Sequence, residues 1–219
     1  MLEFQEDGHI YTIDGKELMS VTTWIEQFVP PFNANIVSSV MSRKSDMSPE
    51  EIRAKWNLKG KIACDWGNAI HGALEYYIKY GEMVGSQQLR DIVANWDEVN
   101  DGKKVFSEVI VYDKDSGLAG TIDQVVQIKD KIVDLRDTKT NEDIHKKSKG
   151  RLKEPFKELS NNSISKYTIQ LSIYKFLIEL HGYTVRNTEI WYLNEGKWEI
   201  IKVEPLKIRS IIKAYAKNN

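Results

Sequence analysis

The sequence predicts an α/β domain with a helical N-terminal elaboration, and two patterns of apolar residues support this prediction. Residues 105–112, 118–128 and 131–138 alternate apolar and polar side chains, which is the period of β-strands, and short turn segments separate them. On both sides of this meander, apolar residues recur at three- and four-residue steps, as in amphipathic helices. The chain has 219 residues, of which 41% are hydrophobic and 29% charged, so it is long enough to bury a core.

The N-terminal segment is expected to fold as a β-hairpin followed by a short helix. Residues 9–13 alternate, and Asp14-Gly15 provides a turn before residues 16–21. Thr23 and Glu26 have the spacing of a capping box, which predicts that a short helix is capped by Thr23.

Further helices are expected on both sides of the meander. Ser48-Pro49 is a start signal, because a capping residue is followed by proline at the first helical position. We predict a weak helix over 33–46, two separate helices over 48–57 and 61–80, a helix over 86–99 and an amphipathic helix over 163–180. Strands over 189–193 and 198–203 and a short helix follow. We expect one domain over 1–219. It would consist of a hairpin and helices (1–60), a core (61–205) and a C-terminal helix (206–219). The core would contain a basic insert (141–162) that forms a loop or partly ordered lid.

The composition excludes several classes of protein. No apolar run approaches the roughly 18 to 20 residues of a membrane span, and the start of the chain lacks the features of a secretory signal. The single cysteine, Cys64, excludes an intramolecular disulfide and any iron–sulfur or zinc site built from cysteines alone. We therefore expect an intracellular protein of the cytoplasm or nucleoid.

A basic stretch interrupts the otherwise balanced charge. The formal net charge is −1, so no global field attracts nucleic acid. Cations nevertheless gather over residues 145–157, against a single acid, Glu154. A solvated loop is the commoner fate of such a run, and a surface that follows a nucleic-acid backbone is the alternative. The cations are Lys146, Lys147, Lys149, Arg151, Lys153 and Lys157.

Two aspartates are expected to lie side by side on neighbouring strands. The [Asp/Glu]-x-Lys spacing occurs four times and is uninformative alone, but Asp137 and Lys139 end a strand, on the face that carries its apolar residues. The tight turn near residue 130 puts Asp123 opposite Asp137, where Cβ atoms are about 4.5–5.5 Å apart. Such carboxylates repel unless they share a proton or bind a divalent cation, and Mg²⁺ or Mn²⁺ suits oxygen ligands. The alternative is that the two aspartates face opposite sides or are offset by a bulge.

The helix over 61–80 carries a second group of candidate residues. Gly67, His71 and Glu75 follow one another at four-residue steps and therefore lie on one side of the helix. Glycine at this position allows another backbone to approach closely. Taken alone, a histidine there is more often structural than a ligand, and a glutamate is more often solvated.

Four blocks of the sequence together resemble the PD-(D/E)xK nuclease superfamily, and specifically its RecB-like exonuclease branch. They span residues 67–174, about half of the chain, and occur in the order of the family's motifs. The resemblance implies a restriction-endonuclease-like core with the element order αβββαβ. The blocks are Gly67 to Glu75 (G-x-x-x-H-x-x-x-E), Gly120 to Asp123 (G-x-x-D), Asp137 to Thr140 (D-x-K-T) and Gln170 to Tyr174 (Q-x-x-x-Y).

The resemblance also implies a role for each matching residue. His71, Asp123 and Asp137 would bind the metal, and the carbonyl of Thr138 would add a ligand. Lys139 would be the catalytic lysine, acting with Asp137 and Asp123, while Glu75 would support the metal or a second one. The residues expected to contact DNA are Gln170, Tyr174, Tyr167, Lys146, Lys147, Lys149, Arg151 and Lys153.

The sequence departs from the family pattern at Arg136. The family usually has an apolar residue before its second acid, so a charge here predicts that the strand leaves the sheet early. The four-cysteine iron–sulfur cluster of some relatives is impossible with one cysteine. No nucleotide-binding G-x-x-x-x-G-K-[ST] motif is present, so no helicase motor is expected in this chain.

These expectations describe a divalent-metal-dependent DNA nuclease, an exonuclease that hydrolyses phosphodiester bonds in DNA processing, repair or recombination. Its cofactor would be Mg²⁺ or Mn²⁺, and its partner would be single-stranded DNA or DNA ends. Three alternatives stay open: a structure- or sequence-selective endonuclease on the same core, a catalytically inactive nucleic-acid-binding module, and an α/β protein with surface carboxylates.

Overall fold

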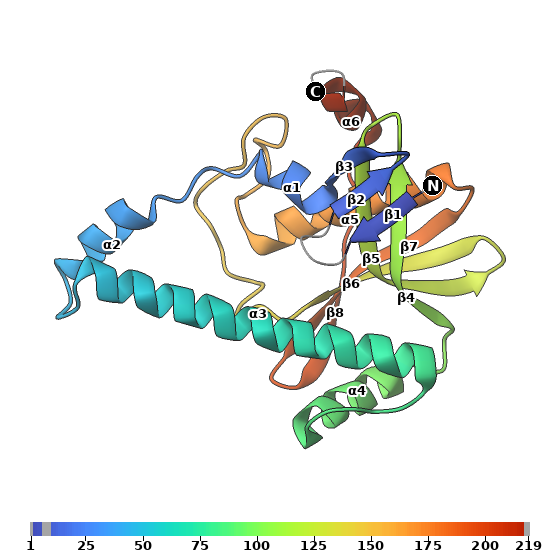
Figure 1. Cartoon of the computed structure of the whole chain (residues 1–219), viewed down its shortest axis with the longest axis horizontal. Helices are drawn as coiled ribbons and strands as arrows, with labels where there is room; N and C mark the ends of the chain where they lie inside the picture. The colour runs from blue at the N-terminus through green and yellow to red at the C-terminus, as the bar shows by residue number, and fades with distance from the viewer. Residues whose placement is uncertain (1, 6–9, 217–219) are drawn as a thin grey trace.

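The computed structural model describes residues 2–5 and 10–216, which form a mixed β-sheet with helices packed on both faces (Figure 1). The strands are β1 (Leu2–Gln5), β2 (Ile10–Ile13), β3 (Lys16–Ser20), β4 (Val105–Asp113), β5 (Leu118–Lys129), β6 (Ile132–Lys139), β7 (Thr184–Asn194) and β8 (Lys197–Lys202). The helices are α1 (Val21–Glu26), α2 (Ala34–Ser42), α3 (Pro49–Tyr80), α4 (Gln87–Asn100), α5 (Ser163–Leu180) and α6 (Arg209–Ala216). The succession α3-β4-β5-β6-α5-β7 is therefore the expected helix, three strands, helix and strand.

Strand β5 connects the two halves of the sheet. The strands are hydrogen-bonded in the order β1-β2-β3-β5-β6-β7-β8, and β4 also pairs with β5. β4, β5 and β6 form the antiparallel meander that the alternating residues predict. β3 and β5, and likewise β6 and β7, run parallel, which makes the sheet mixed.

β7 contributes side chains to the cores on both faces of the sheet. Because side chains alternate along a strand, Ile190 and Tyr192 point to one face and join the larger core, to which α1, α5 and α6 contribute. Trp191 and Leu193 point to the other face and join a second core formed with α3 and α4. The sheet is thus covered by α5 on one face and by the α3–α4 pair on the other.

α3 is a single helix of 32 residues, which corrects the prediction of two separate helices. Its start is as predicted, because the Ser48 hydroxyl accepts the Glu51 N–H and the Glu51 carboxylate accepts the Ser48 N–H. Gly81 ends the helix in the left-handed conformation, with φ 73°. Gly60 does not interrupt the helix, since a glycine costs only about 1 kcal/mol relative to alanine and keeps the N–H that proline lacks.

The N-terminal segment differs from the prediction in its details. The cap of α1 is Ser20, whose hydroxyl oxygen accepts the Thr23 N–H, and not Thr23 itself. β1 adds a strand to the predicted hairpin and pairs with β2. Residue 9 of the predicted first strand and residues 217–219 of the predicted C-terminal helix lie outside the described residues.

β6 continues to Lys139, which corrects the expectation that the strand leaves the sheet at Arg136. The buried Arg136 guanidinium donates a 2.8 Å hydrogen bond to Asn100, lies 3.5 Å from the Glu189 carboxylate and stacks 4.0 Å from the centre of the Trp191 ring. Burial lowers the pKa of Arg136 to about 10, while the neighbouring carboxylates oppose this shift. Partners from α4 and β7 therefore compensate for burying a charge in the sheet.

The basic insert 141–162 is a loop without helices or strands, and it is anchored to the body of the protein. The Lys153 N–H donates to the Phe28 carbonyl at 2.8 Å, beyond the end of α1. The apolar side chains of the insert enter the larger core, whereas its cations lie at the surface. The buried residues are Ile144, Leu152 and Phe156.

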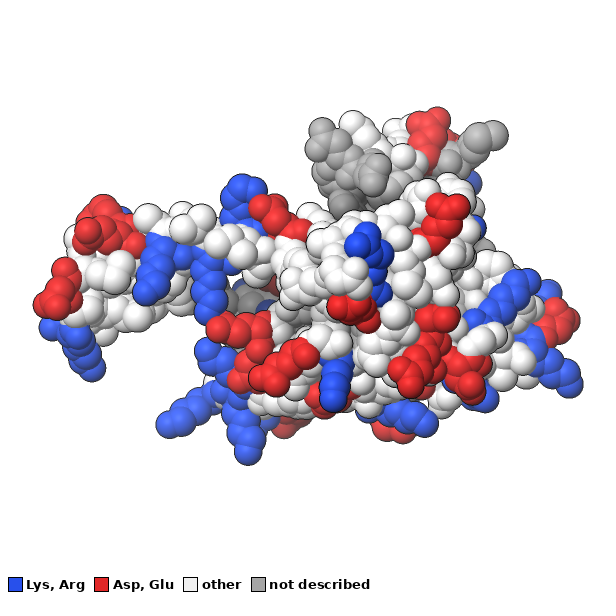
Figure 2. Space-filling model, turned by 90° about the horizontal axis from the view of Figure 1, so that it is seen from below, with Lys and Arg blue, Asp and Glu red and all other residues white. Residues whose placement is uncertain are grey.

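The described surface carries both signs of charge. Figure 2 shows acidic and basic side chains interspersed over the face that is seen from below, in agreement with the net charge of −1. Within residues 2–5 and 10–216, no helix has the length and apolarity needed to cross a membrane.

Candidate metal centre

The candidate site lies where two strands share one edge of β5. β4 pairs with β5 from Leu118 onward, so β3 and β6 must both use the other edge. β3 pairs there with Leu118 and Ala119, and β6 pairs from Gln124 onward. In the described part of the chain, no strand pairs with this edge between Gly120 and Asp123. A cleft of about 570 Å³ opens at this stretch of β5 and is lined by residues of α1, α3 and α5.

Three potential metal ligands converge in this cleft from three different elements. His71 comes from α3, Asp123 from β5 and Glu108 from β4, and one ligand atom of each lies within 4.8 Å of the others. His71 Nδ1 is 3.8 Å from Asp123 Oδ2, and the same carboxylate oxygen accepts the Thr138 N–H at 2.6 Å. An imidazole and two carboxylates can hold Mg²⁺ or Mn²⁺, for which carboxylate oxygens are the usual ligands.

Glu108 joins the cluster through an unusual backbone conformation. Its φ is 51°, in the left-handed region that non-glycine residues seldom adopt, although it stands within β4. The neighbouring pairs Ser107–Gln124 and Val109–Ile122 put it opposite Asp123. Such a conformation costs roughly 1–3 kcal/mol and persists where the surroundings impose it, often at functional sites.

The sequence reasoning missed Glu108, although a signal was present. The turn 113–117 fixes the register of the hairpin, and counting back from it places position 108 opposite position 123. The same counting identified the neighbourhood of Asp123 and Asp137, and the pair Gln124–Arg136 confirms that register.

Asp137 and Lys139 form an ion pair beside the cluster, with Asp137 buried and Lys139 partly buried. Lys139 Nζ is 2.8 Å from Asp137 Oδ2, and Asp137 is 1% exposed. Neither carboxylate oxygen of Asp137 has a hydrogen-bond partner of normal geometry among the described residues. Buried carboxylate oxygens without such partners are costly, and a cation next to them would supply the missing interaction. The donor set therefore fits a divalent metal, although Asp137 is not one of the three residues in the 4.8 Å cluster.

The electrostatics of the pair follow from its burial. Burial raises the pKa of Asp137 to about 6, Lys139 and His71 oppose this shift, and the Asp123 charge adds to it. Burial by itself would lower the pKa of the Lys139 ammonium, but the Asp137 and Asp123 carboxylates outweigh burial and raise it. The ammonium group also lies 4.6 Å from the centre of the Tyr167 ring, which favours a cation.

Two glycines allow the helices to approach the site. A Cβ at Gly120 would lie 2.6 Å from Cε1 of Tyr174, so only glycine leaves room for this ring against β5. A Cβ at Gly67 would lie 3.1 Å from Oγ1 of Thr140, which follows β6. The close approach predicted at Gly67 is therefore present, and the partner is a side chain rather than a backbone.

Gln170 and Tyr174 line the cleft from α5. The Gln170 amide donates to the Tyr174 hydroxyl at 3.2 Å, and both side chains are buried. Burial raises the pKa of Tyr174 well above its usual value, so its hydroxyl stays neutral. Tyr167, one turn before Gln170 on α5, donates a 3.3 Å hydrogen bond to Asn141.

Of the other predicted site residues, Glu75 lines the cleft, whereas the cations of the insert lie outside it. Glu75 lines the cleft and is ion-paired with Lys79. The Thr138 hydroxyl accepts a 3.2 Å hydrogen bond from Gln124. The cations of the insert are exposed and none lines the cleft; two of them donate to carbonyl groups, Arg151 to Glu158 and Lys153 to Gln27.

The chain is distantly similar to solved structures of other proteins. No protein-family model matches it, and no curated protein matches it. A solved structure from Eubacterium rectale that bears the provisional name of exonuclease is 13% identical, with a TM-score of 0.43, over 69% of this chain and 62% of that chain. The structure of the protein SSO0001 is 17% identical, with a TM-score of 0.34, over 68% of each chain. This chain thus spans less than two thirds of the first structure's length. Structural similarities with TM-scores this low do not support a conclusion about function.

Proposed function

We propose that the chain is a divalent-metal-dependent nuclease that hydrolyses phosphodiester bonds of DNA, with the core and motifs of the PD-(D/E)xK superfamily and its RecB-like exonuclease branch. The observation that supports this proposal is the convergence of His71, Glu108 and Asp123 beside the ion pair of Asp137 and Lys139. The succession of elements α3-β4-β5-β6-α5-β7 agrees with the implied αβββαβ core.

His71, Glu108 and Asp123 would hold Mg²⁺ or Mn²⁺, and the Asp137 carboxylate and Thr138 carbonyl would complete the ligand set as the resemblance implies. A bound divalent cation would neutralise phosphate oxygens and lower the pKa of a water molecule. Asp123 has a second task in this arrangement, because its acceptance of the Thr138 N–H holds the end of β6 in place. Glu75, with its Lys79 partner, would support the site from the next turn of α3.

Lys139 would act on the substrate through its charge. Its ion pair with Asp137 and the Tyr167 ring fix the ammonium group at the end of β6. A fixed ammonium can orient the attacking water and stabilise the negative charge that develops on the scissile phosphate. Because it is already protonated, it donates hydrogen bonds and does not act as the base.

The DNA strand would lie along the α5 side of the cleft. Gln170 and Tyr174 form the wall of the cleft and Tyr167 extends it, so they are suited to contact phosphates or stack on bases. The exposed cations of the insert would follow the backbone further out, with interactions that weaken as salt rises. These residues are Lys146, Lys147, Lys149, Arg151 and Lys153.

The test is a cleavage assay with end-labelled linear DNA in Mg²⁺ or Mn²⁺, with EDTA as the blank. We expect wild type to cleave only with metal, and Lys139→Ala to lose about a hundredfold or more in rate, as when one donor to a developing oxyanion is removed. The control is Lys197→Ala, an exposed lysine in the β7–β8 hairpin, which should cleave like wild type. A Lys139→Ala variant that retains most of its rate would refute the assignment.

A circular single strand distinguishes the two modes of cleavage. An exonuclease requires an end and leaves the circle intact, whereas an endonuclease on the same core cuts it. DNA binding without turnover in any metal would instead identify a binding module.

A further inference from the structure

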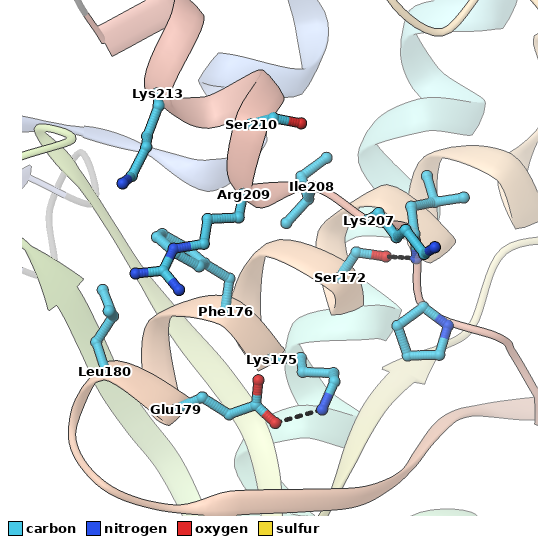
Figure 3. A pocket seen from close by; sticks show the side chains of 12 residues that line it. Ser172, Lys175, Phe176, Glu179, Leu180, Lys207, Ile208, Arg209, Ser210 and Lys213 are labelled. Atoms are coloured by element: carbon cyan, nitrogen blue, oxygen red, sulfur yellow. Dashed lines mark hydrogen bonds and ion pairs between the residues drawn. The ribbon is translucent and has the colours of Figure 1, made fainter.

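A second cavity lies between α5 and the segment that leads into α6, on the side of α5 away from the metal cleft. Its volume is about 700 Å³, and its lining residues come from α5 and from residues 205–213 (Figure 3). Gln170 and Tyr174 of α5 face the metal cleft, whereas Lys175 and Phe176 line this cavity. The cavity and the metal cleft therefore share a helix but no lining residue.

Unbalanced positive charge distinguishes this cavity. Lys207, Arg209 and Lys213 all line it and are exposed, and no side-chain hydrogen bond or ion pair joins any of the three to the described residues. Figure 3 shows the Arg209 and Lys213 side chains extending to the same side of the cavity. They lie four residues apart on α6, where like charges repel each other and destabilise a helix. An anion between them would reverse that repulsion.

The cavity's own acid does not balance these cations. Glu179 is the one carboxylate among the lining residues, and it is ion-paired with Lys175, one turn earlier on α5. Glu179 also accepts the Val185 N–H at 3.4 Å, which directs it toward the start of β7. Three positive charges therefore remain around the cavity after the internal pair is counted.

Apart from Ser172 and Ser210, the rest of the lining is apolar. Phe176 and Leu180 from α5 and Pro205, Leu206 and Ile208 from the opposite wall supply carbon surface next to the cations. Ser172 cannot serve a ligand freely, because its hydroxyl donates to the Thr168 carbonyl and accepts the Leu206 N–H at 2.9 Å. A bare inorganic anion would use the cations and leave this surface uncovered.

We propose that this cavity binds a nucleotide-sized phosphate monoester, with the phosphate between Arg209 and Lys213 and the organic part against Phe176 and Leu180. Guanidinium and ammonium groups are the usual phosphate donors, and the volume is within the range of about 300–1,000 Å³ that small-molecule sites occupy. Binding here requires neither a divalent metal nor cleavage, so the proposal is independent of the nuclease function.

The experiment is titration calorimetry in EDTA with four probes: deoxyadenosine 5′-monophosphate, inorganic phosphate, deoxyadenosine and a single-stranded oligonucleotide. The nucleotide should bind more tightly than either part alone, since only it uses both the cations and the apolar wall. The double variant Arg209→Ala, Lys213→Ala should lose about tenfold or more in affinity, because each charged hydrogen bond contributes strongly. The double variant Lys103→Ala, Lys197→Ala removes the same charge from exposed lysines elsewhere and should stay within twofold of wild type.

Equal affinity of the two double variants would overturn the assignment to this cavity. So would a nucleotide that binds no more tightly than inorganic phosphate. A single-stranded oligonucleotide that binds through Arg209 and Lys213 more tightly than the mononucleotide would also overturn it, in favour of a surface that follows a DNA strand.

Discussion

At the scale of single residues, Glu108 is the least expected member of the metal cluster. The four motif blocks do not contain it, and its role depends on its position opposite Asp123 and on the left-handed backbone at φ 51°. A carboxylate in that position completes a set of one imidazole and two acids within 4.8 Å. The local sequence shows an ordinary polar residue of a strand, whereas the cross-strand register shows a potential ligand.

The Glu108→Gln variant should bind Mn²⁺ about tenfold or more weakly than wild type, because the amide keeps the size of the side chain but removes an anionic ligand. Calorimetric titration of the metal-free protein measures this change. Glu98→Gln makes the same substitution at an exposed position of α4 and should leave the affinity unchanged. Equal affinities of the two variants would remove Glu108 from the site.

The raised pKa of Asp137, about 6, predicts a pH dependence of metal binding. A proton on this carboxyl competes with the cation, so the affinity for Mn²⁺ should fall as pH decreases from 7 to 5. Asp137→Asn should bind Mn²⁺ more weakly at pH 7 and with a smaller change between these pH values. The same pH dependence in both proteins would show that Asp137 does not take part.

The free energy of unfolding of the metal-free protein should change with pH in the opposite direction to the affinity for Mn²⁺. The folded state binds the Asp137 proton more tightly than the unfolded state, whose pKa is near 3.8. This group therefore contributes stability at low pH that is lost as pH rises from about 4 to 6. Mn²⁺ should restore stability above pH 6, because it replaces the proton.

The pair of Asp137 and Lys139 could be predicted from the sequence because both the spacing and the strand period are local properties. β6 was also expected to leave the sheet early at Arg136. This prediction was wrong because Arg136 contacts residues that lie far away in the chain. Asn100, Glu189 and Trp191 surround its guanidinium. No pattern within the strand reports such partners.

At the scale of secondary-structure elements, α3 shows where local signals mislead. The prediction placed a break between two helices at residues 58–60, a stretch that contains Gly60. The helix continues because its one proline, Pro49, stands at the first position, where no donor is needed, and because its C-terminal half is held by the core with α4. The start at Ser48 was predictable, since a capping box acts within four residues.

At Gly120 the Tyr174 ring of α5 lies directly against β5. Gly120→Ala would put a Cβ 2.6 Å from Cε1 of the Tyr174 ring and should lower the free energy of unfolding by about 1–3 kcal/mol. Gly60→Ala meets nothing within 4 Å on α3 and should raise that free energy by up to about 1 kcal/mol. Urea denaturation of the metal-free variants measures both effects. A Gly120→Ala variant as stable as wild type would contradict the packing described for Tyr174.

At the scale of the whole molecule, the site exists because the sheet is interrupted along one edge of β5. β3 and β6 share that edge and leave residues 120–123 without a strand partner on it, within the described chain. Side chains from α3 and α5, which otherwise cover opposite faces, both reach the cleft that opens there. Apart from β1, the strands were predictable from their alternation, but this sharing of an edge was not, because it joins residues about 100 positions apart.

The central claim is that one divalent cation binds between His71, Glu108 and Asp123, beside Asp137 and Lys139. Anomalous diffraction from crystals of the protein soaked in Mn²⁺ tests it most directly. The account predicts a peak in the cleft at about 2.0–2.6 Å from ligand atoms of these three residues. A fully soaked crystal with no peak in the cleft, or with Mn²⁺ held by other residues, would contradict it.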